Sequence, residues 1–218
     1  MAGFKLHPLF ISGDNKLEYA LLPAYEGSIS DNALHSKAGA KPVSNITIGN
    51  ADAAARAHGV GWSITNMQME SAIQMLQMVE FGTMNGQNAL EKGICTISSV
   101  SNYNCSSLTG STASLGNTSG PAASTTNEVN GSTTVYSEAG KRAISYRGME
   151  NPWGNIWRMI GGMKITGSNQ NNAGIPFICL SADYSDTNAY QSAGFKLPSA
   201  YGWISAMGYG GKDMDWLY

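Results

Sequence analysis

The sequence is poor in charged residues and has no cluster of basic side chains. Lys and Arg together number 13 and Asp and Glu 15 among 218 residues, which gives a formal net charge of −2 at pH 7. The charged fraction is 13%, about half of what soluble domains usually carry. Without a concentration of Lys and Arg, the chain offers little electrostatic attraction to nucleic acid or to an anionic membrane. We therefore expect neither among its partners.

Cysteines and long apolar runs are also scarce. Cys95, Cys105 and Cys179 form no Cys-x-x-Cys pair, which argues against a disulfide framework and against a zinc site. The chain lacks a run of about 18 apolar residues, as a membrane-spanning helix needs. The apolar piece at residues 9–11 is too short for the core of a secretory signal. We expect no metal, no cofactor, no signal peptide and no membrane insertion.

The N-terminal part of the chain has the pattern of a hairpin, a loop and a short helix. Apolar and aromatic residues flank a turn signal at residues 12–15, which predicts a β-hairpin within residues 6–29. Small and polar residues at 30–49 predict a loop. Asn50 before an alanine-rich stretch predicts a helix over residues 51–58 with Asn50 as its N-cap.

The clearest helix signal follows. Thr65 and Gln68 have the spacing of a capping box. From Met69 to Val79 apolar residues recur every three to four positions, and Gly82 ends the pattern. The pattern predicts an amphipathic helix of about four turns, with its methionine-rich stripe in the core.

The middle of the chain is dominated by Ser, Thr, Gly and Asn. Residues 106–134 contain few large apolar side chains and one charged residue, Glu128. A stretch of this composition buries little apolar surface, which predicts a long surface loop at about 96–135 within a single domain over residues 1–218. Short strands are expected beyond it, at 143–146, 156–165 and 177–180. Strands, then two helices, then further short strands predict the α+β class.

One segment near residue 150 resembles a known family. The run Gly154-Asn155-Ile156-Trp157 resembles the GN-[VI]-W signature of the C-type-lectin-like domains that are shared by formylglycine-generating enzymes and the variable proteins of diversity-generating retroelements. Further segments are similar to phage tail and structural proteins of gut bacteria: 78–85, 87–93, 146–151, 194–198 and 208–217. The resemblance implies a C-type-lectin-like fold with two helices and several short antiparallel strands.

In that motif the residues have structural roles by their chemistry. Gly154 permits a tight backbone turn, Asn155 bonds neighbouring backbone, and Trp157 is expected to fill a core. Trp153, beside Pro152, is expected to be half exposed.

An enzymatic function is not expected. The formylglycine-generating members rely on a pair of cysteines late in the domain, whereas here only Cys179 follows the motif. None of His7, His35 and His58 accompanies a local nucleophile signature such as Gly-x-Ser-x-Gly. We therefore predict no catalytic residue.

The resemblance instead implies recognition. In that family the late strands and loops present a surface rich in Tyr, Trp, Asn and Ser, and tyrosines supply rigid contact area with a hydroxyl. Tyr184, Tyr190, Trp203 and Tyr209 are the expected ligand-binding residues. The alternative is that Trp203, Tyr209 and Trp216 are core strand residues, since aromatic residues favour strands.

The expected function is that of a phage virion protein, made in the host bacterial cytoplasm. It would be a tail-tip or receptor-binding protein that contacts a bacterial surface glycan or protein through aromatic and polar loops. Other virion proteins are expected partners, and a homotrimer is an expectation from tail-fibre proteins in general. Two alternatives stay open: a structural or decoration protein of the virion without receptor binding, and a degenerate enzyme of the formylglycine-generating type.

Overall fold

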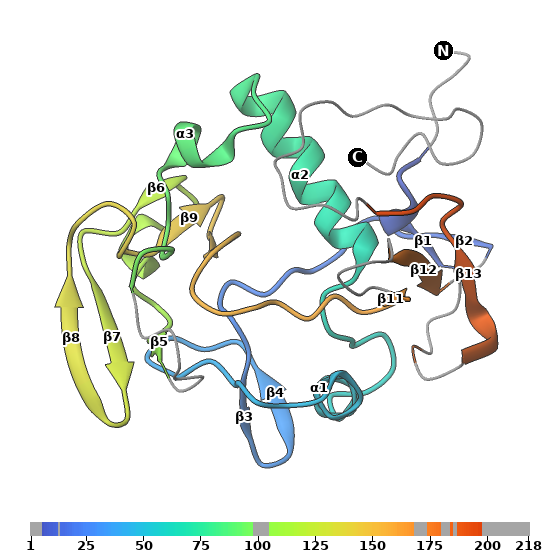
Figure 1. The fold of residues 1–218 in the computed structure, drawn as a ribbon, viewed down its shortest axis with the longest axis horizontal. Coiled ribbons are helices and arrows are strands. Elements are labelled where there is room, and N and C mark those ends of the chain that lie inside the picture. The colour runs from blue at the N-terminus through green and yellow to red at the C-terminus, as the bar shows by residue number, and fades with distance from the viewer. Residues whose placement is uncertain are drawn as a thin grey trace. The chain divides into compact units, whose positions relative to one another are not determined.

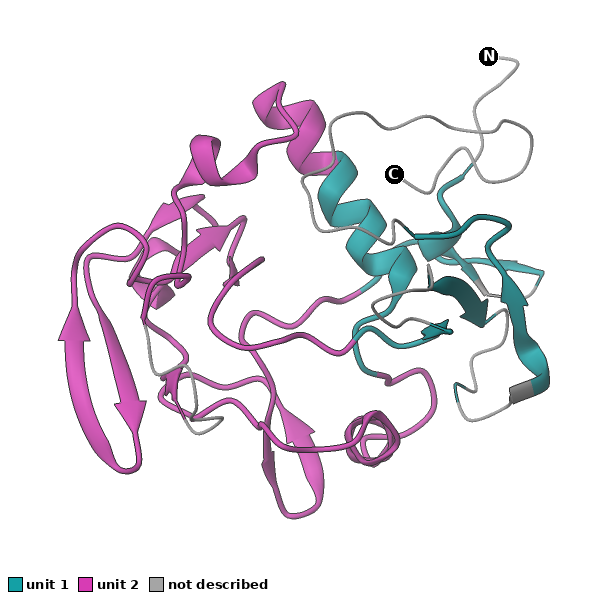
Figure 2. Ribbon diagram, in the orientation of Figure 1, with its two compact units in different colours: residues 1–20, 64–75, 160–218 teal, residues 21–63, 76–159 magenta. Residues whose placement is uncertain are grey.

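The computed structural model describes residues 6–12, 14–97, 105–167, 174–179, 184 and 187–197 (Figure 1). Strands come first along the chain, three consecutive helices follow, and the remaining strands come after them in antiparallel pairs, which confirms the α+β class. The chain forms two compact units (Figure 2): unit 1 comprises residues 1–20, 64–75 and 160–218, and unit 2 comprises residues 21–63 and 76–159. The expectation of a single domain over residues 1–218 stays a prediction.

Three α-helices are present in the described residues: α1 (Ile48–Arg56), α2 (Met67–Phe81) and α3 (Gly86–Leu90). The helix predicted at 51–58 begins three residues earlier, because Thr47 rather than Asn50 is its N-cap. The Thr47 hydroxyl accepts a hydrogen bond from the Asn50 amide at 3.2 Å. Across the part of the chain that the structure describes, no helix has both the length and the apolar character to cross a membrane.

The predicted second helix corresponds to α2. Its start is fixed by Asn66, whose side-chain oxygen accepts from the Met69 amide at 3.0 Å, so Asn66 serves in place of the expected Thr65. The expected apolar stripe is buried only in part: Ile73 is 5% exposed, whereas Val79 is 85% exposed. The second half of the helix therefore does not present a continuous core face.

Where the structure describes unit 1, it contains two small antiparallel sheets. The first is a hairpin of β1 (Ile11–Ser12) and β2 (Asn15–Lys16), preceded by a 3₁₀ turn, η1 (Pro8–Phe10). This hairpin confirms the turn predicted at 12–15, but residues 17–25 form no strand. The second sheet has the order β11-β12-β13, with β11 at Met163–Thr166, β12 at Ile175–Cys179 and β13 at Tyr190–Ser192. A further 3₁₀ turn, η3 (Thr187–Ala189), precedes β13.

Three small sheets are present in the described residues of unit 2. A hairpin of β3 (Ser28–Ser30) and β4 (Ala33–His35) occupies part of the predicted loop at 30–49. Its two turn residues, Asp31 and Asn32, have φ of 52° and 60°, the left-handed pair that a tight hairpin turn needs. The other sheets have the orders β5-β7-β8 and β10-β9-β6. Their strands are β5 (Ser106–Ser107), β6 (Gly120–Pro121), β7 (Thr125–Val129), β8 (Ser132–Tyr136), β9 (Ile144–Tyr146) and β10 (Met149–Glu150).

The prediction of a long surface loop at about 96–135 is wrong where the structure describes this segment. It contains β5 to β8 and the 3₁₀ turn η2 (Ala113–Leu115), with β7 and β8 side by side as a hairpin (Figure 1). Ser107, Thr125 and Asn127 are buried. Small polar side chains pack here because they are hydrogen-bonded, as between the Ser107 hydroxyl and Asn127 Oδ1 at 3.4 Å.

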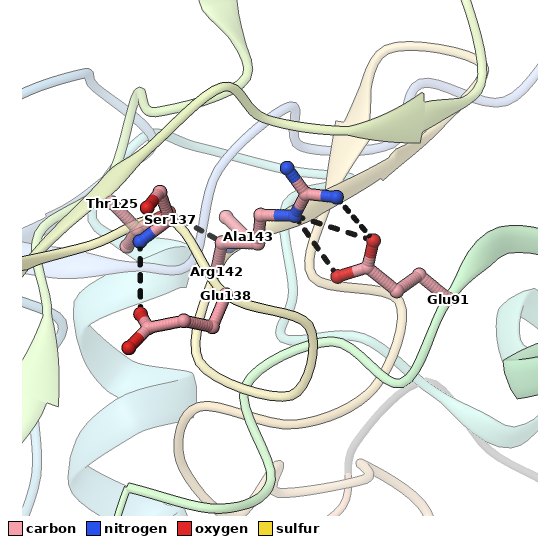
Figure 3. Close-up of polar contacts among 6 residues, drawn as sticks. All are labelled: Glu91, Thr125, Ser137, Glu138, Arg142 and Ala143. Atoms are coloured by element: carbon pink, nitrogen blue, oxygen red, sulfur yellow. Dashed lines mark hydrogen bonds and ion pairs between the residues drawn. The ribbon is translucent and has the colours of Figure 1, made fainter.

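An ion pair fixes the turn between β8 and β9 (Figure 3). The Arg142 guanidinium donates to both carboxylate oxygens of Glu91, with the shortest contact 2.6 Å from Nη2 to Oε2. The next residue, Ala143, donates its amide to Thr125 Oγ1 at 2.7 Å. Glu91 ends α3 with a φ of 119°, a conformation that side chains other than glycine rarely adopt. The ion pair therefore connects the strained end of α3 to the residues that lead into β9.

Candidate functional site

Two neighbouring polar features of unit 2 surround the turn of β9 and β10 and the motif segment that follows. The first is buried. Glu150, 1% exposed, accepts from the Gly110 amide at Oε1 and from the amide and hydroxyl of Thr112 at Oε2, each at 2.8 Å. A carboxylate with three donors is well compensated for its burial. It ties β10 to the segment that the sequence had indicated as loop.

The motif residue Asn155 belongs to a second, partly buried set of hydrogen bonds. Its Oδ1 accepts from the Ser107 amide at 2.8 Å, and its Nδ2 donates to the Glu26 carboxylate at 2.5 Å. Asn151 also donates to Glu26, at 3.2 Å, and the Arg158 guanidinium donates to the Asn151 carbonyl at 2.6 Å. Burial raises the pKa of Glu26, and the hydrogen bonds from Asn155 and Asn151 partly oppose that rise.

The other motif residues have different surroundings. Gly154 has a φ of 85°, and a Cβ at this position would lie 2.6 Å from the Ile94 carbonyl oxygen, so the backbone requires glycine. The expectation that Trp157 fills a core is wrong, because Trp157 is 98% exposed. Trp153 is half-buried, and its indole nitrogen donates to the Lys92 carbonyl at 3.1 Å. Asn155, rather than Trp157, is therefore the structural centre of the motif.

Of the four residues expected to bind a ligand, Trp203 and Tyr209 lie outside the described residues. Tyr184 and Tyr190 lie together in unit 1, where the Tyr190 hydroxyl donates to the Tyr184 carbonyl at 2.9 Å. The Tyr184 ring covers Gly161, and its hydroxyl accepts from Asn66 Nδ2 at 3.1 Å. The two tyrosines thus form one intramolecular cluster, and their role in ligand binding stays a prediction.

The second polar feature of unit 2 is an open pocket of about 500 Å³, which the sequence had not indicated. Its lining residues come from three separate segments: Glu80 from the last turn of α2, Asn117 and Ser119 from the stretch after η2, and Arg147 from the turn between β9 and β10. A helix end and a hairpin turn position Glu80 and Arg147, and Asn117 and Ser119 belong to the stretch between η2 and β6.

The turn that carries Arg147 is tightly specified. Arg147 and Gly148 have φ of 52° and 86°, as a two-residue hairpin turn requires. The Arg147 amide donates to the Ser119 hydroxyl at 3.1 Å. A Cβ at position 148 would lie 3.0 Å from Asn117 Oδ1. The glycine therefore allows the Asn117 side chain to approach the turn closely.

The Glu80 carboxylate and the Arg147 guanidinium are the charged groups of the pocket, and the buried Tyr146 phenol supports the carboxylate from behind. Glu80 Oε2 accepts from the Tyr146 hydroxyl at 2.9 Å and from Arg147 Nε at 2.8 Å. The hydrogen bond from Tyr146, followed by that from Arg147, lowers the pKa of Glu80. Burial and the Glu80 carboxylate raise the pKa of Tyr146 to about 12. Phe81 packs edge-on against Tyr146, with ring centroids 5.8 Å apart, and keeps the phenol in place.

Several donors and acceptors of the pocket are available to a ligand. Within the described residues, Glu80 Oε1, both terminal nitrogens of Arg147 and the whole Asn117 side-chain amide have no hydrogen-bond partner. The Ser119 hydroxyl, which accepts from the Arg147 amide, keeps its own proton to donate. The pocket therefore offers a carboxylate, a guanidinium, an amide and a hydroxyl to one ligand, with no net charge from its ionised side chains.

Sequence reasoning missed this pocket because Glu80 and Arg147 are 67 residues apart and follow no spacing rule. Arg147 lies in the segment 146–151, which carries part of the family resemblance, but the sequence assigns this residue no role. In the described ranges, no group of three or more His, Cys, Asp or Glu side chains is placed to hold a metal ion. No protein-family model, curated protein or solved structure matches this chain.

Proposed function

We propose that this chain is a binding module that recognises a neutral glycan of a bacterial surface through the pocket of Glu80, Asn117, Ser119 and Arg147. The observation that carries the proposal is the set of unpaired donors and acceptors around one open pocket. Sugar hydroxyls both donate and accept hydrogen bonds. Two adjacent hydroxyls can therefore bind one planar carboxylate, guanidinium or amide group through two parallel hydrogen bonds.

The charge of the pocket favours a neutral ligand over an anion. Arg147 is paired with Glu80 through Nε, so the guanidinium is already balanced by a carboxylate. A phosphate or a carboxylate on the ligand would approach Glu80 Oε1 as well as Arg147 and would be repelled there. A hydroxyl-rich ring has no such conflict.

The wider identity remains part of the same proposal. The run from residue 154 to 157 resembles the signature of the C-type-lectin-like domains, and this supports a C-type-lectin-like fold in a phage virion protein. The α+β class is compatible with that fold. In this view Tyr184, Tyr190, Trp203 and Tyr209 supply a second, aromatic contact surface. Other virion proteins and a second and third copy of the chain are the proposed assembly partners.

Binding of the purified chain to an array of bacterial surface polysaccharides and simple neutral sugars tests this function. Asn117→Ala and Arg147→Ala are expected to weaken binding by at least about tenfold, the loss of one good hydrogen-bonding group to a ligand. Trp157→Ala is the matched control, since Trp157 is exposed and does not line the pocket. Folding of each variant is checked by its melting temperature.

Two results would contradict the proposal. Glycan binding that the pocket variants leave intact would place recognition elsewhere, with the tyrosine cluster as the next surface to substitute. Absence of glycan binding by a folded chain that assembles into virions would instead favour the structural or decoration role.

A further inference from the structure

Two of the three histidines of the chain meet on one side of unit 2. His35 ends β4, and His58 follows α1. Their ring centroids are 5.1 Å apart and the ring planes are at 87° to each other. This pair lies among residues 21–63 and is separate from the Glu80 pocket in sequence and in its lining residues.

The hydrogen bonds of the pair define which nitrogen carries the proton. His58 Nε2 lies 2.7 Å from the Leu34 carbonyl oxygen, and His35 Nε2 lies 3.3 Å from the Ser30 carbonyl oxygen. A carbonyl oxygen only accepts, so Nε2 must be the donor in both rings. In the neutral rings both Nδ1 atoms then keep an unprotonated lone pair, and neither has a hydrogen-bond partner among the described residues.

This is the arrangement found in histidines that bind metals. A metal-ligating histidine commonly donates its other ring N–H to a backbone carbonyl or carboxylate, which fixes the tautomer and the ring orientation. Here both rings are fixed in this way, and the carbonyl that holds His58 belongs to Leu34, the residue before His35. The two imidazoles are therefore tied to the same hairpin.

The spacing of the rings also suits a shared ion. A zinc–nitrogen bond is about 2.0–2.1 Å, and an imidazole nitrogen lies about 1.1 Å from its ring centre, so two histidines on a tetrahedral ion have centroids about 5.2 Å apart. The centroids of His35 and His58 are 5.1 Å apart. We infer that His35 and His58 form a two-histidine site, through their Nδ1 atoms, for a divalent transition-metal ion such as Zn²⁺.

The site would be open. With two protein ligands, the remaining positions of the ion are left to water or to a group from outside the chain, which distinguishes it from a closed structural site of four protein ligands. Imidazole ligands suit zinc, copper and nickel better than calcium or magnesium. The site is independent of the proposed glycan pocket, so either assignment can fail without the other.

The structure supplies its own reporter for the test. The Trp62 ring centroid lies 5.0 Å from that of His58, so Cu²⁺ bound at His58 is expected to quench Trp62 fluorescence. The first experiment is titration calorimetry of the whole chain with Zn²⁺, using His35→Gln, His58→Gln and the double variant. Glutamine keeps a side-chain N–H for the carbonyl while removing the imidazole lone pair. His7→Gln is the matched control.

The expected result is one Zn²⁺ per chain, with affinity reduced about tenfold or more by either single substitution, because one of two joined ligands is lost. Binding should be unchanged in His7→Gln. Saturable Cu²⁺ quenching should be largely removed by Trp62→Phe, a readout that leaves both histidines in place. Absence of Zn²⁺ binding to the unsubstituted chain, or equal binding by the double variant, would overturn the inference and leave a packed pair of rings.

Discussion

The side-chain amide of Asn155 donates to the Glu26 carboxylate at 2.5 Å, although the two residues are 129 positions apart in the sequence. The same side chain accepts from the Ser107 amide at 2.8 Å. One asparagine thus joins three distant segments of unit 2, at a position whose φ of 62° is left-handed. This residue, and not the aromatic side chain two positions later, explains why the motif is structural.

We expect Asn155→Gly to lower the free energy of unfolding by about 1–3 kcal/mol, because the buried Ser107 amide loses its acceptor. Asn155→Ala should lose about a further 1–2 kcal/mol, since a left-handed φ is strained for alanine. Trp157→Ala should change stability by no more than about 0.5 kcal/mol, as for other exposed positions. Denaturant unfolding of the three variants provides the comparison, and a larger loss for Trp157→Ala than for Asn155→Gly would contradict it.

Glu26 should be important as an acceptor more than as a charge. Glu26→Ala leaves the Nδ2 groups of Asn151 and Asn155 without this acceptor, which predicts a loss of about 1–3 kcal/mol. Glu26→Gln keeps an acceptor oxygen and removes the burial of a charge, so its loss should be clearly smaller. Equal destabilisation by the two substitutions, measured by chemical denaturation, would show that the charge itself is required.

Much of the helical part of the fold follows from the sequence, whereas the arrangement of strands does not. The periodicity from Met69 and the stop at Gly82 identify α2. Its N-cap is Asn66 rather than the predicted Thr65, so the helix begins one residue later than the capping-box pattern indicates. The prediction of a loop at 106–134 is wrong because it equates burial with large apolar side chains. Thr125 and Asn127 are buried through hydrogen bonds to partners that only the folded chain brings near.

The candidate site shows the same limit. Glu80 and Arg147 meet because a helix end and a hairpin turn converge, and no local spacing encodes that encounter. The sequence did mark the segment from Tyr146 to Asn151 as distinctive, yet its chemistry depends on partners from other elements. Of the four aromatic residues predicted to bind a ligand, the structure describes Tyr184 and Tyr190, and these two form a cluster.

Thr125 provides a test of packing in the segment once expected to be a loop. Thr125→Val preserves shape but leaves the buried Ala143 amide without its acceptor, so we expect a loss of about 1–3 kcal/mol. The same substitution at Thr133, which is exposed on β8, is the control and should change stability by at most about 0.5 kcal/mol. If thermal melting showed both variants to be neutral, the segment would be a surface loop after all.

The Tyr146 hydroxyl should ionise at a higher pH than an ordinary tyrosine. Its pKa is raised from 10.0 to about 12, so ultraviolet titration should show one tyrosine ionising about two pH units after an ordinary one. A raised pKa in the folded state means that the stabilisation is fully present below pH 10.0 and is lost as the pH rises toward about 12. Tyr146→Phe should remove the late transition; its persistence in that variant would assign it to another tyrosine.

The most direct test of the glycan-binding pocket is a nuclear magnetic resonance titration of the chain with neutral sugars, such as glucose, galactose, mannose and N-acetylglucosamine. The side-chain signals of Asn117 Nδ2 and Arg147 Nε report on the pocket itself. We predict saturable shifts of both signals with at least one sugar, and no such shifts for the Trp157 indole, which lies outside the pocket. Sugar binding that shifts other signals while Asn117 and Arg147 stay unchanged would contradict the account.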